Sequence, residues 1–259
     1  MKEIIVDNQD NKHKPTNQTI GKETMMEQKP FNFQQGEVLL VDKPLTWTSF
    51  DVVNKIRYAI KKKLGIKKIK VGHAGTLDPL ATGLLIICTG KFTKKIDGFQ
   101  AQVKEYTGEF YVGHTTPSYD RETEHDASFD TTHINLDLIN LARQKFIGKI
   151  EQTPPIFSAI KVNGQAAYKK ARKGQEVQLK KREVTIYDFD ILAHQLPTLP
   201  FKVRCSKGTY IRSLAHEYGQ ELGAGAYLHS LRRTMIGDFS VNDAWQLDDL
   251  IQQINQKSV

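Results

Sequence analysis

The sequence contains little cysteine and no long hydrophobic run. Cys88 and Cys205 are its only cysteines, and neither belongs to a C-x-x-C or Cys/His metal-binding pattern. A disulfide-stabilised scaffold and a cysteine-based zinc site are therefore excluded, and we expect both thiols to be reduced. No segment approaches the roughly 20 consecutive apolar residues of a membrane span, and the N-terminus lacks the apolar segment of a signal peptide. These absences predict a cytoplasmic protein that does not associate with membranes.

The motifs of several enzyme classes are also missing. There is no P-loop, and the segment from Gly223 to Leu228 lacks the third glycine of a dinucleotide-binding turn. The histidines form no H-E-x-x-H pattern, and neither a G-x-S-x-G nor a catalytic-cysteine signature occurs. We therefore expect no metal and no small-molecule cofactor, so any chemistry must depend on side chains alone.

The charge is strongly positive and unevenly distributed. Lysine and arginine number 37 against 29 aspartate and glutamate residues, which gives a net charge of +8. One basic run extends from Lys55 to Lys70 without an acid, and a second extends from Lys161 to Arg182 with Glu176 as its acid. A single run is typical of a solvated surface. Two such runs in one chain favour binding to the phosphates of a nucleic acid.

The chain divides into an N-terminal extension and one folded domain. Residues 1–35 are rich in Asn, Gln, Lys and Thr and show no sustained apolar period, which predicts a mobile extension. Apolar patterns and turn residues predict strands at 37–42, 84–88, 104–112, 157–162, 183–192 and 201–205. They predict a helix that is capped by Thr48 or Ser49 and extends to Leu64, and further helices at 135–147, 166–172, 210–222 and 247–254. Because these elements follow no regular βαβ order, we expect an α+β domain over 36–259, with helices packed on a mixed sheet.

The loop around Asp78 is the first candidate site. Glycines at 72, 75 and 83 allow the backbone to approach a ligand closely, and Pro79 stiffens the loop in front of the predicted strand 84–88. A carboxylate held there could act as a base or as a nucleophile. The alternative is an ordinary Asp-Pro turn whose side chain binds local backbone N–H groups.

The segment from Cys205 to Arg212 is the second candidate, because a strand gives way to a glycine turn and a helix start. Arg212 could pair with a distant carboxylate and fix its rotamer, or it could lie on a solvated helix face. Tyr106 could stack on a base from its strand, or it could be a packing residue. His73 could present an aromatic surface to RNA, or it could be an ordinary loop histidine.

Several segments, taken in order, carry a family resemblance. They are Gly36 to Pro44, Lys70 to Gly83 (KVGHAGTLDPLATG), Lys104 to Tyr106, Gln152 to Pro155, and Cys205 to Arg212 (CSKGTYIR). This set resembles the bacterial tRNA pseudouridine synthase B family, the tRNA pseudouridine(55) synthases. The resemblance implies a pseudouridine synthase fold, with a central mixed and largely antiparallel sheet and a catalytic loop in a cleft. It also implies an isomerase that converts the T-loop uridine of tRNA to pseudouridine by base flipping.

The resemblance implies roles for individual residues. Asp78 is similar to the catalytic aspartate, Tyr106 to the tyrosine that stacks on the target base, and Arg212 to the arginine that pairs with the aspartate. His73 is similar to the histidine that packs against the T loop. The other residues that we assign to the substrate site are Lys43, Pro44, Gly75, Tyr210 and Leu231. The expected partner is the T arm of tRNA, and we expect a monomer.

The chain departs from the family pattern at two places. Only a short segment follows Arg233, so we expect no full C-terminal RNA-binding domain. Thr46 stands where the family often has glycine. Two other functions remain as alternatives: a guide-dependent pseudouridine synthase, and a non-catalytic protein that binds and folds tRNA.

Overall fold

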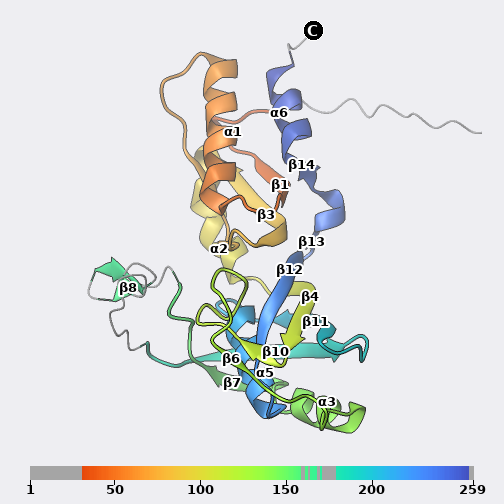
Figure 1. Cartoon of the computed structure of the whole chain (residues 1–259). Coiled ribbons are helices and arrows are strands. Elements are labelled where there is room, and N and C mark those ends of the chain that lie inside the picture. The colour runs from red at the N-terminus through yellow and green to blue at the C-terminus, as the bar shows by residue number, and fades with distance from the viewer. Residues whose placement is uncertain (1–30, 159–160, 163, 168–169, 171–178, 257–259) are drawn as a thin grey trace, which may run out of the picture. The chain divides into compact units, whose positions relative to one another are not determined.

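The computed structural model describes residues 31–158, 161–162, 164–167, 170 and 179–256 (Figure 1). The helices are α1 (Ser49–Leu64), α2 (Ile96–Ala101), α3 (Leu136–Gln144), α5 (Ile211–Glu221) and α6 (Leu247–Asn255), with 3₁₀ turns η1 (Gly90–Lys95) and η2 (Val241–Asp243). None of the helices in these ranges is long and apolar enough to cross a membrane.

A ten-stranded sheet organises the described chain. Its strands are β1 (Val38–Lys43), β2 (Val71–His73), β3 (Ala81–Thr89), β4 (Lys104–Val112), β7 (Gly148–Gln152), β10 (Arg182–Ile191), β11 (Thr198–Cys205), β12 (Ala226–Ile236), β13 (Phe239–Ser240) and β14 (Trp245–Gln246). The order is β14-β1-β3-β12-β4-β11-β10-β7, with β2 beside β3 and β13 beside β12. The β1–β14 and β3–β12 pairs are parallel and the other pairs are antiparallel. The predicted α+β class with a mixed, largely antiparallel sheet is therefore confirmed.

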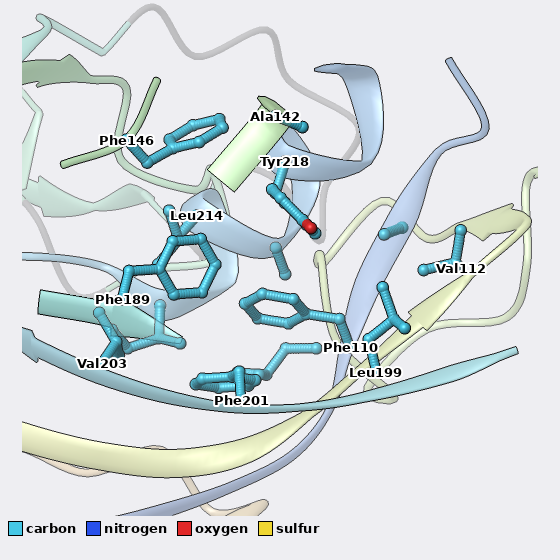
Figure 2. Close-up of a cluster of buried hydrophobic side chains, with 14 of the residues drawn as sticks. Phe110, Val112, Ala142, Phe146, Phe189, Leu199, Phe201, Val203, Leu214 and Tyr218 are labelled. Carbon is cyan, nitrogen blue, oxygen red and sulfur yellow. The ribbon is translucent and has the colours of Figure 1, made fainter. Parts of the chain in front are cut away.

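Helices cover two different regions of this sheet. The first region is a core in which α1 and α6 pack on β1 and β3. The second lies where α3 and α5 pack on β4, β10, β11 and β12, and it contains many aromatic side chains (Figure 2). There Phe110 stacks on Phe201 with ring centroids 4.1 Å apart, and Tyr218 of α5 meets Phe110 at 5.8 Å. This packing fixes the position of α5 relative to the central strands.

Helix α1 shows why its predicted position is confirmed. The Thr48 hydroxyl accepts a hydrogen bond from the Asp51 N–H at 3.0 Å, and the Asp51 carboxylate accepts one from the Thr48 N–H at 3.0 Å. This reciprocal pair is a capping box, which satisfies backbone donors at the helix start. At the other end Gly65 adopts a left-handed conformation with φ 63°. Local residue chemistry thus sets both ends of the helix.

Residues 31–35 differ from the prediction of a mobile extension. Phe33 is 4% exposed in the core beneath α1, and its carbonyl accepts a hydrogen bond from Thr89 Oγ1 at 2.9 Å. The folded domain therefore includes residues 31–35, because Phe31 and Phe33 supply apolar surface within an otherwise polar stretch. Residues 1–30 of the predicted extension lie outside the described residues.

Other predicted elements also need revision. Residues 156–158 form a bend. Of the described residues in the predicted strand 157–162, Lys161–Val162 pairs, as β8 with β9 (Gln165–Ala166), and 159–160 lie outside the described residues. Most of the predicted helix 166–172 and much of the second basic run lie outside the described residues. Strands β7 and β12 were not predicted. The remaining small sheet pairs β5 (His114–Thr115) with β6 (Ala127–Ser128).

Candidate active site

A cavity of about 390 Å³ brings together side chains that lie far apart in the sequence. Asp78 precedes β3, Tyr106 belongs to β4, and Arg212 lies in the first turn of α5. Gly75, Tyr210 and Leu231, which the sequence analysis assigned to the substrate site, also line the cavity. The residues meet because β12 pairs with both β3 and β4, which places Leu231 opposite Ala81 and Gly108.

The backbone around Asp78 is fixed from several sides. Ser49 Oγ accepts a hydrogen bond from the Leu77 N–H at 2.8 Å and donates one to the Leu77 carbonyl at 3.2 Å. The Thr46 N–H donates to the Pro79 carbonyl at 2.8 Å, and the Ala81 N–H donates to the Asp78 carbonyl at 3.0 Å. These contacts come from the start of α1, from the loop that precedes it and from the first residue of β3. The Asp78 carboxylate is therefore presented from a rigid turn.

Lys43 supports this turn from behind. Its side chain is fully buried, and its ammonium donates to the carbonyls of Pro44 at 2.9 Å, Trp47 at 2.6 Å and Pro79 at 3.4 Å. Burial lowers the pKa of Lys43 to about 8, although the Asp78 carboxylate opposes this shift. Lys43 and Pro44 are not among the described residues that line the cavity. The structure thus places them behind the turn and outside the cavity lining.

Thr46 adopts the left-handed conformation, with φ 70°. A residue with a β-branched side chain is strained there, whereas glycine is not. The hydrogen bond from its N–H to the Pro79 carbonyl holds it in this conformation. The loop therefore keeps the shape that suits glycine even though the chain has threonine.

Arg212 connects the turn to two other segments. Its Nε lies 2.9 Å from Asp78 Oδ2, and its Nη1 lies 3.6 Å from Asp120 Oδ2. The guanidinium also donates to the carbonyls of Ser118 at 3.3 Å and Phe157 at 3.0 Å. Burial raises the pKa of Asp120, and the Arg212 guanidinium opposes that shift. Arg212 is therefore held by a network and is not a solvated helix residue.

Tyr106 and Arg233 lie side by side on neighbouring strands. Their Cα atoms are paired across β4 and β12, and Tyr106 is 9% exposed. Burial raises the pKa of the Tyr106 hydroxyl, and the positive charge of Arg233 acts in the opposite direction. The ring of Tyr106 therefore forms a largely buried part of the cavity wall.

Arg233 and Lys104 are site residues that the sequence analysis missed. Arg233 is 1% exposed; its Nε donates to the Leu84 carbonyl at 2.8 Å and its Nη2 to the Gly75 carbonyl at 3.0 Å. Lys104 donates to the carbonyls of Gln100 at 2.5 Å and Gln102 at 2.6 Å, and burial lowers its pKa to about 8. Lys104 belongs to the segment Lys104 to Tyr106 that carries the family resemblance, and this membership could have indicated a place in the site. No local pattern indicated that Arg233 would be buried.

Glycine is required where β3 approaches β12. At Gly83, φ is +102° and an added Cβ would lie 2.3 Å from the Arg233 carbonyl oxygen. Such a contact is impossible without movement of the backbone. Gly83 thus allows the strand that carries Arg233 to lie against the end of the Asp78 turn.

Tyr210 and His73 occupy different surroundings. The Tyr210 backbone is clamped by the Gln152 amide, which accepts from its N–H at 2.7 Å and donates to its carbonyl at 3.0 Å. His73 ends β2 and is half-buried, and within the described residues its Nδ1 has no hydrogen-bond partner. Burial lowers the pKa of His73, and Arg233 adds to the effect. His73 is not among the described residues that line the cavity.

Part of the first basic run forms a second cavity, of about 320 Å³. Lys68 and Lys70 line it together with Lys91 and Lys94 from η1. Its cationic lining suits phosphate groups.

The chemistry available in the main cavity follows from these groups. A carboxylate on a rigid turn can act as a base or a nucleophile, and a neighbouring aromatic ring can stack on a planar ligand. The surrounding cations favour an anionic substrate. In the ranges that the structure describes, no group of histidine, cysteine, aspartate and glutamate side chains is arranged to hold a metal.

Comparison with known proteins identifies close relatives. Residues 61–211 match the family model "TruB family pseudouridylate synthase (N terminal domain)", and residues 212–258 match "tRNA pseudouridylate synthase B C-terminal domain". The chain is 56% identical to tRNA pseudouridine synthase B of Flavobacterium johnsoniae, over 83% of this chain and 94% of that protein. It is 54% identical to tRNA pseudouridine synthase B of Phocaeicola vulgatus, over 88% of this chain and 97% of that protein.

Solved structures show the same fold. One chain of a Cbf5-Nop10-Gar1 complex is 30% identical and superposes with a TM-score of 0.64. The match covers 85% of this chain and 54% of that chain, so this chain spans about half the length of the solved one.

Proposed function

This chain belongs to the TruB family of pseudouridylate synthases and converts uridine in tRNA to pseudouridine, and we propose that its target is the T-loop uridine at position 55. It is an isomerase. The T-loop target is supported by membership of the TruB family, and the observation that carries the chemistry is the Asp78–Arg212 ion pair beside the ring of Tyr106 in one cavity. That arrangement supplies one carboxylate, one support for it and one stacking surface.

The reaction rearranges bonds without adding or removing atoms overall. The N1–C1′ glycosidic bond breaks, the uracil turns, and C5 bonds to C1′. The proton on C5 leaves and N1 gains one, so no oxidant or energy source is needed. Two routes use Asp78: attack on C1′ to form a covalent intermediate, or removal of the C2′ proton to form a glycal.

The other site residues act around this carboxylate. A stacked loop uridine must be flipped out of the RNA to reach Asp78, and the ring of Tyr106 replaces the stacking that is lost. Arg212 fixes the Asp78 rotamer through the 2.9 Å contact. Tyr106, or a water that it positions, removes the C5 proton at the end. Lys43 and Pro44 support the Asp78 turn from behind. His73, at the end of β2, packs against the T loop outside the cavity.

We assign binding of the T arm to a single catalytic domain, which includes residues 31–35 in addition to the predicted range 36–259. Strand β12 lies in the segment matched by the C-terminal family model, yet it pairs with β3 and β4 of the N-terminal segment. This pairing supports one folded unit that contains both matched segments. The lysines of the first basic run hold T-arm phosphates, so the affinity falls as salt rises. A monomer in the cytoplasm, where tRNA is found, fits this assignment.

Release of tritium from a T-arm hairpin labelled at uridine C5 tests the proposal. The wild type should release tritium without a guide RNA, and Asp78→Asn should bind the hairpin equally well but release none. A hairpin with cytidine in place of the target uridine is the control that shows whether the released tritium comes from that position. Release that required a guide RNA would favour the guide-dependent alternative, and binding without release would favour the tRNA-folding alternative.

A further inference from the structure

The cations of the active cavity differ in how far they are already engaged. The cavity is lined by Lys104, Arg182, Arg212 and Arg233. Three of them are at most 5% exposed, and each of these donates to backbone carbonyls in its own surroundings. Such groups shape the cavity and are poorly placed to reach a phosphate at its mouth.

Arg182 is held in a different way. It begins β10, it is partly exposed, and its guanidinium carbon lies 4.3 Å from the centroid of the Tyr210 ring. Its Nη2 donates to the Gly208 carbonyl, which fixes the plane of the guanidinium against the ring. Within the described residues its Nε has no hydrogen-bond partner. The side chain is thus oriented in advance, and because its Nε is buried, a ligand in the cavity would have to be bound by the terminal Nη groups.

The neighbours of Arg182 match the chemistry of a phosphodiester. Ser206, Gly208 and Thr209 line the same part of the cavity and contribute no acidic side chain. A planar guanidinium forms two parallel hydrogen bonds to phosphate oxygens, which a lysine cannot reproduce. A flipped nucleotide turns about its backbone, so its own phosphodiesters remain at the mouth of the pocket that holds its base.

We propose that Arg182 binds a phosphodiester that flanks the flipped uridine, and that it thereby positions the ribose over Asp78. This inference rests on the proposed function and adds a positioning residue to it. Arg182 does not touch the reacting atoms. Its contact determines how closely C1′ and C2′ approach the carboxylate, and a small misplacement there slows the reaction.

The test combines two protein variants with T-arm RNAs in which one phosphodiester beside the target is a neutral methylphosphonate. One RNA carries this change on the 5′ side and another on the 3′ side. On unmodified RNA, Arg182→Ala should lower kcat/KM about 30-fold, the loss expected for a charge-assisted hydrogen-bond pair. On one of the two modified RNAs the wild type should already be impaired, and Arg182→Ala should cause no further loss.

Arg182→Lys should recover only part of the loss, because it keeps the charge but not the flat contact with Tyr210. Arg204→Ala is the matched control, since Arg204 is an exposed cation of β11 outside the cavity lining. It should lower kcat/KM by the same small factor on every RNA. Unchanged thermal unfolding of the variants excludes misfolding.

An equal loss for Arg182→Ala on all three RNAs would overturn the phosphate contact. The same comparison, made as RNA affinity with Asp78→Asn as the parent, tests the contact without turnover. If the wild type released no tritium from any RNA, the proposed function would fail. The affinity comparison would still decide the role of Arg182.

Discussion

Arg212 Nε lies 2.9 Å from Asp78 Oδ2, and the arginine is much the more deeply buried of the two, at 4% exposure against 41%. The buried partner therefore positions the accessible one. Arg212 can do so because Asp120 and the carbonyls of Ser118 and Phe157 hold it in place.

Arg212→Lys should lower the single-turnover rate of pseudouridine formation at least about 100-fold, while RNA affinity changes little. Lysine keeps the charge but cannot reach Asp78, Asp120 and both carbonyls at once, so the Asp78 carboxylate loses its alignment. The rate is measured with saturating enzyme. Lys207→Arg, at an exposed position just before α5, is the control. A rate near that of the wild type would show that Arg212 does not align Asp78.

Lys43→Met should destabilise the protein by about 3 kcal/mol and lower kcat more than RNA affinity. The change leaves the carbonyls of Pro44, Trp47 and Pro79 without their buried donor, and each such loss costs roughly 1 kcal/mol or more. Urea unfolding measures the stability. Lys55→Met removes an exposed lysine of α1 and should leave stability within about 0.5 kcal/mol of the wild type. Equal stabilities of the two variants would contradict the supporting role of Lys43.

Thr46→Gly should stabilise the protein by about 1 kcal/mol. Removing a β-branched side chain from φ 70° relieves roughly 1 to 2 kcal/mol of strain, and the greater freedom of glycine in the unfolded chain offsets part of that gain. The thermal midpoint should rise accordingly. Thr46→Ala keeps the Cβ atom and should show a smaller gain. A lower midpoint for Thr46→Gly would mean that the threonine side chain has a favourable contact that outweighs the strain.

Glu217 should make the protein less stable as the pH rises from about 4.5 to about 7. Burial raises the pKa of Glu217 to about 7, against the opposing effects of the Thr153 N–H and Lys181. The folded state therefore binds more protons than the unfolded state in this interval, and stability falls as they are released. Glu217→Gln should remove this fall and be more stable than the wild type at pH 8 by roughly 2 kcal/mol.

Urea unfolding at several pH values checks the Glu217 prediction. The difference in the free energy of unfolding between wild type and variant, taken at each pH, cancels the contribution of other titrating groups. Glu183→Gln, at a well exposed position of β10, should show the same pH dependence as the wild type. Parallel curves for Glu217→Gln and the wild type would argue against an unusual proton affinity at Glu217.

The sequence predicted elements whose ends depend on nearby residues. Helix α1 begins with a capping box and ends at a glycine, and both signals lie within the helix or next to it. Strand β4 was predicted with its observed bounds because apolar residues alternate along it. The family resemblance was needed to predict the site residues, because the spacing of residues alone left Asp78 as either a catalytic group or a turn former.

Strand β12 could not be predicted because the hydrogen-bond and ion-pair partners of its polar residues lie far away in the sequence. Arg232 pairs with Asp42 of β1 at 2.6 Å, and Arg233 donates to carbonyls near the Asp78 turn. In the sequence, adjacent arginines after His229 interrupt any apolar pattern. Their partners become visible only once β1, β3 and β12 lie side by side.

The position of β12 also limits the order in which the sheet can form while the chain is being synthesised. In the sheet it stands between β3 and β4, although its residues 226–236 are translated long after both of those strands. A nascent chain can form the antiparallel β1–β3 pair and the β4–β11–β10 strands before β12 is made, but β12 is the strand that joins them in the sheet. The cavity, which Leu231 and Arg233 help to line, therefore cannot be complete before residues 226–236 have been synthesised.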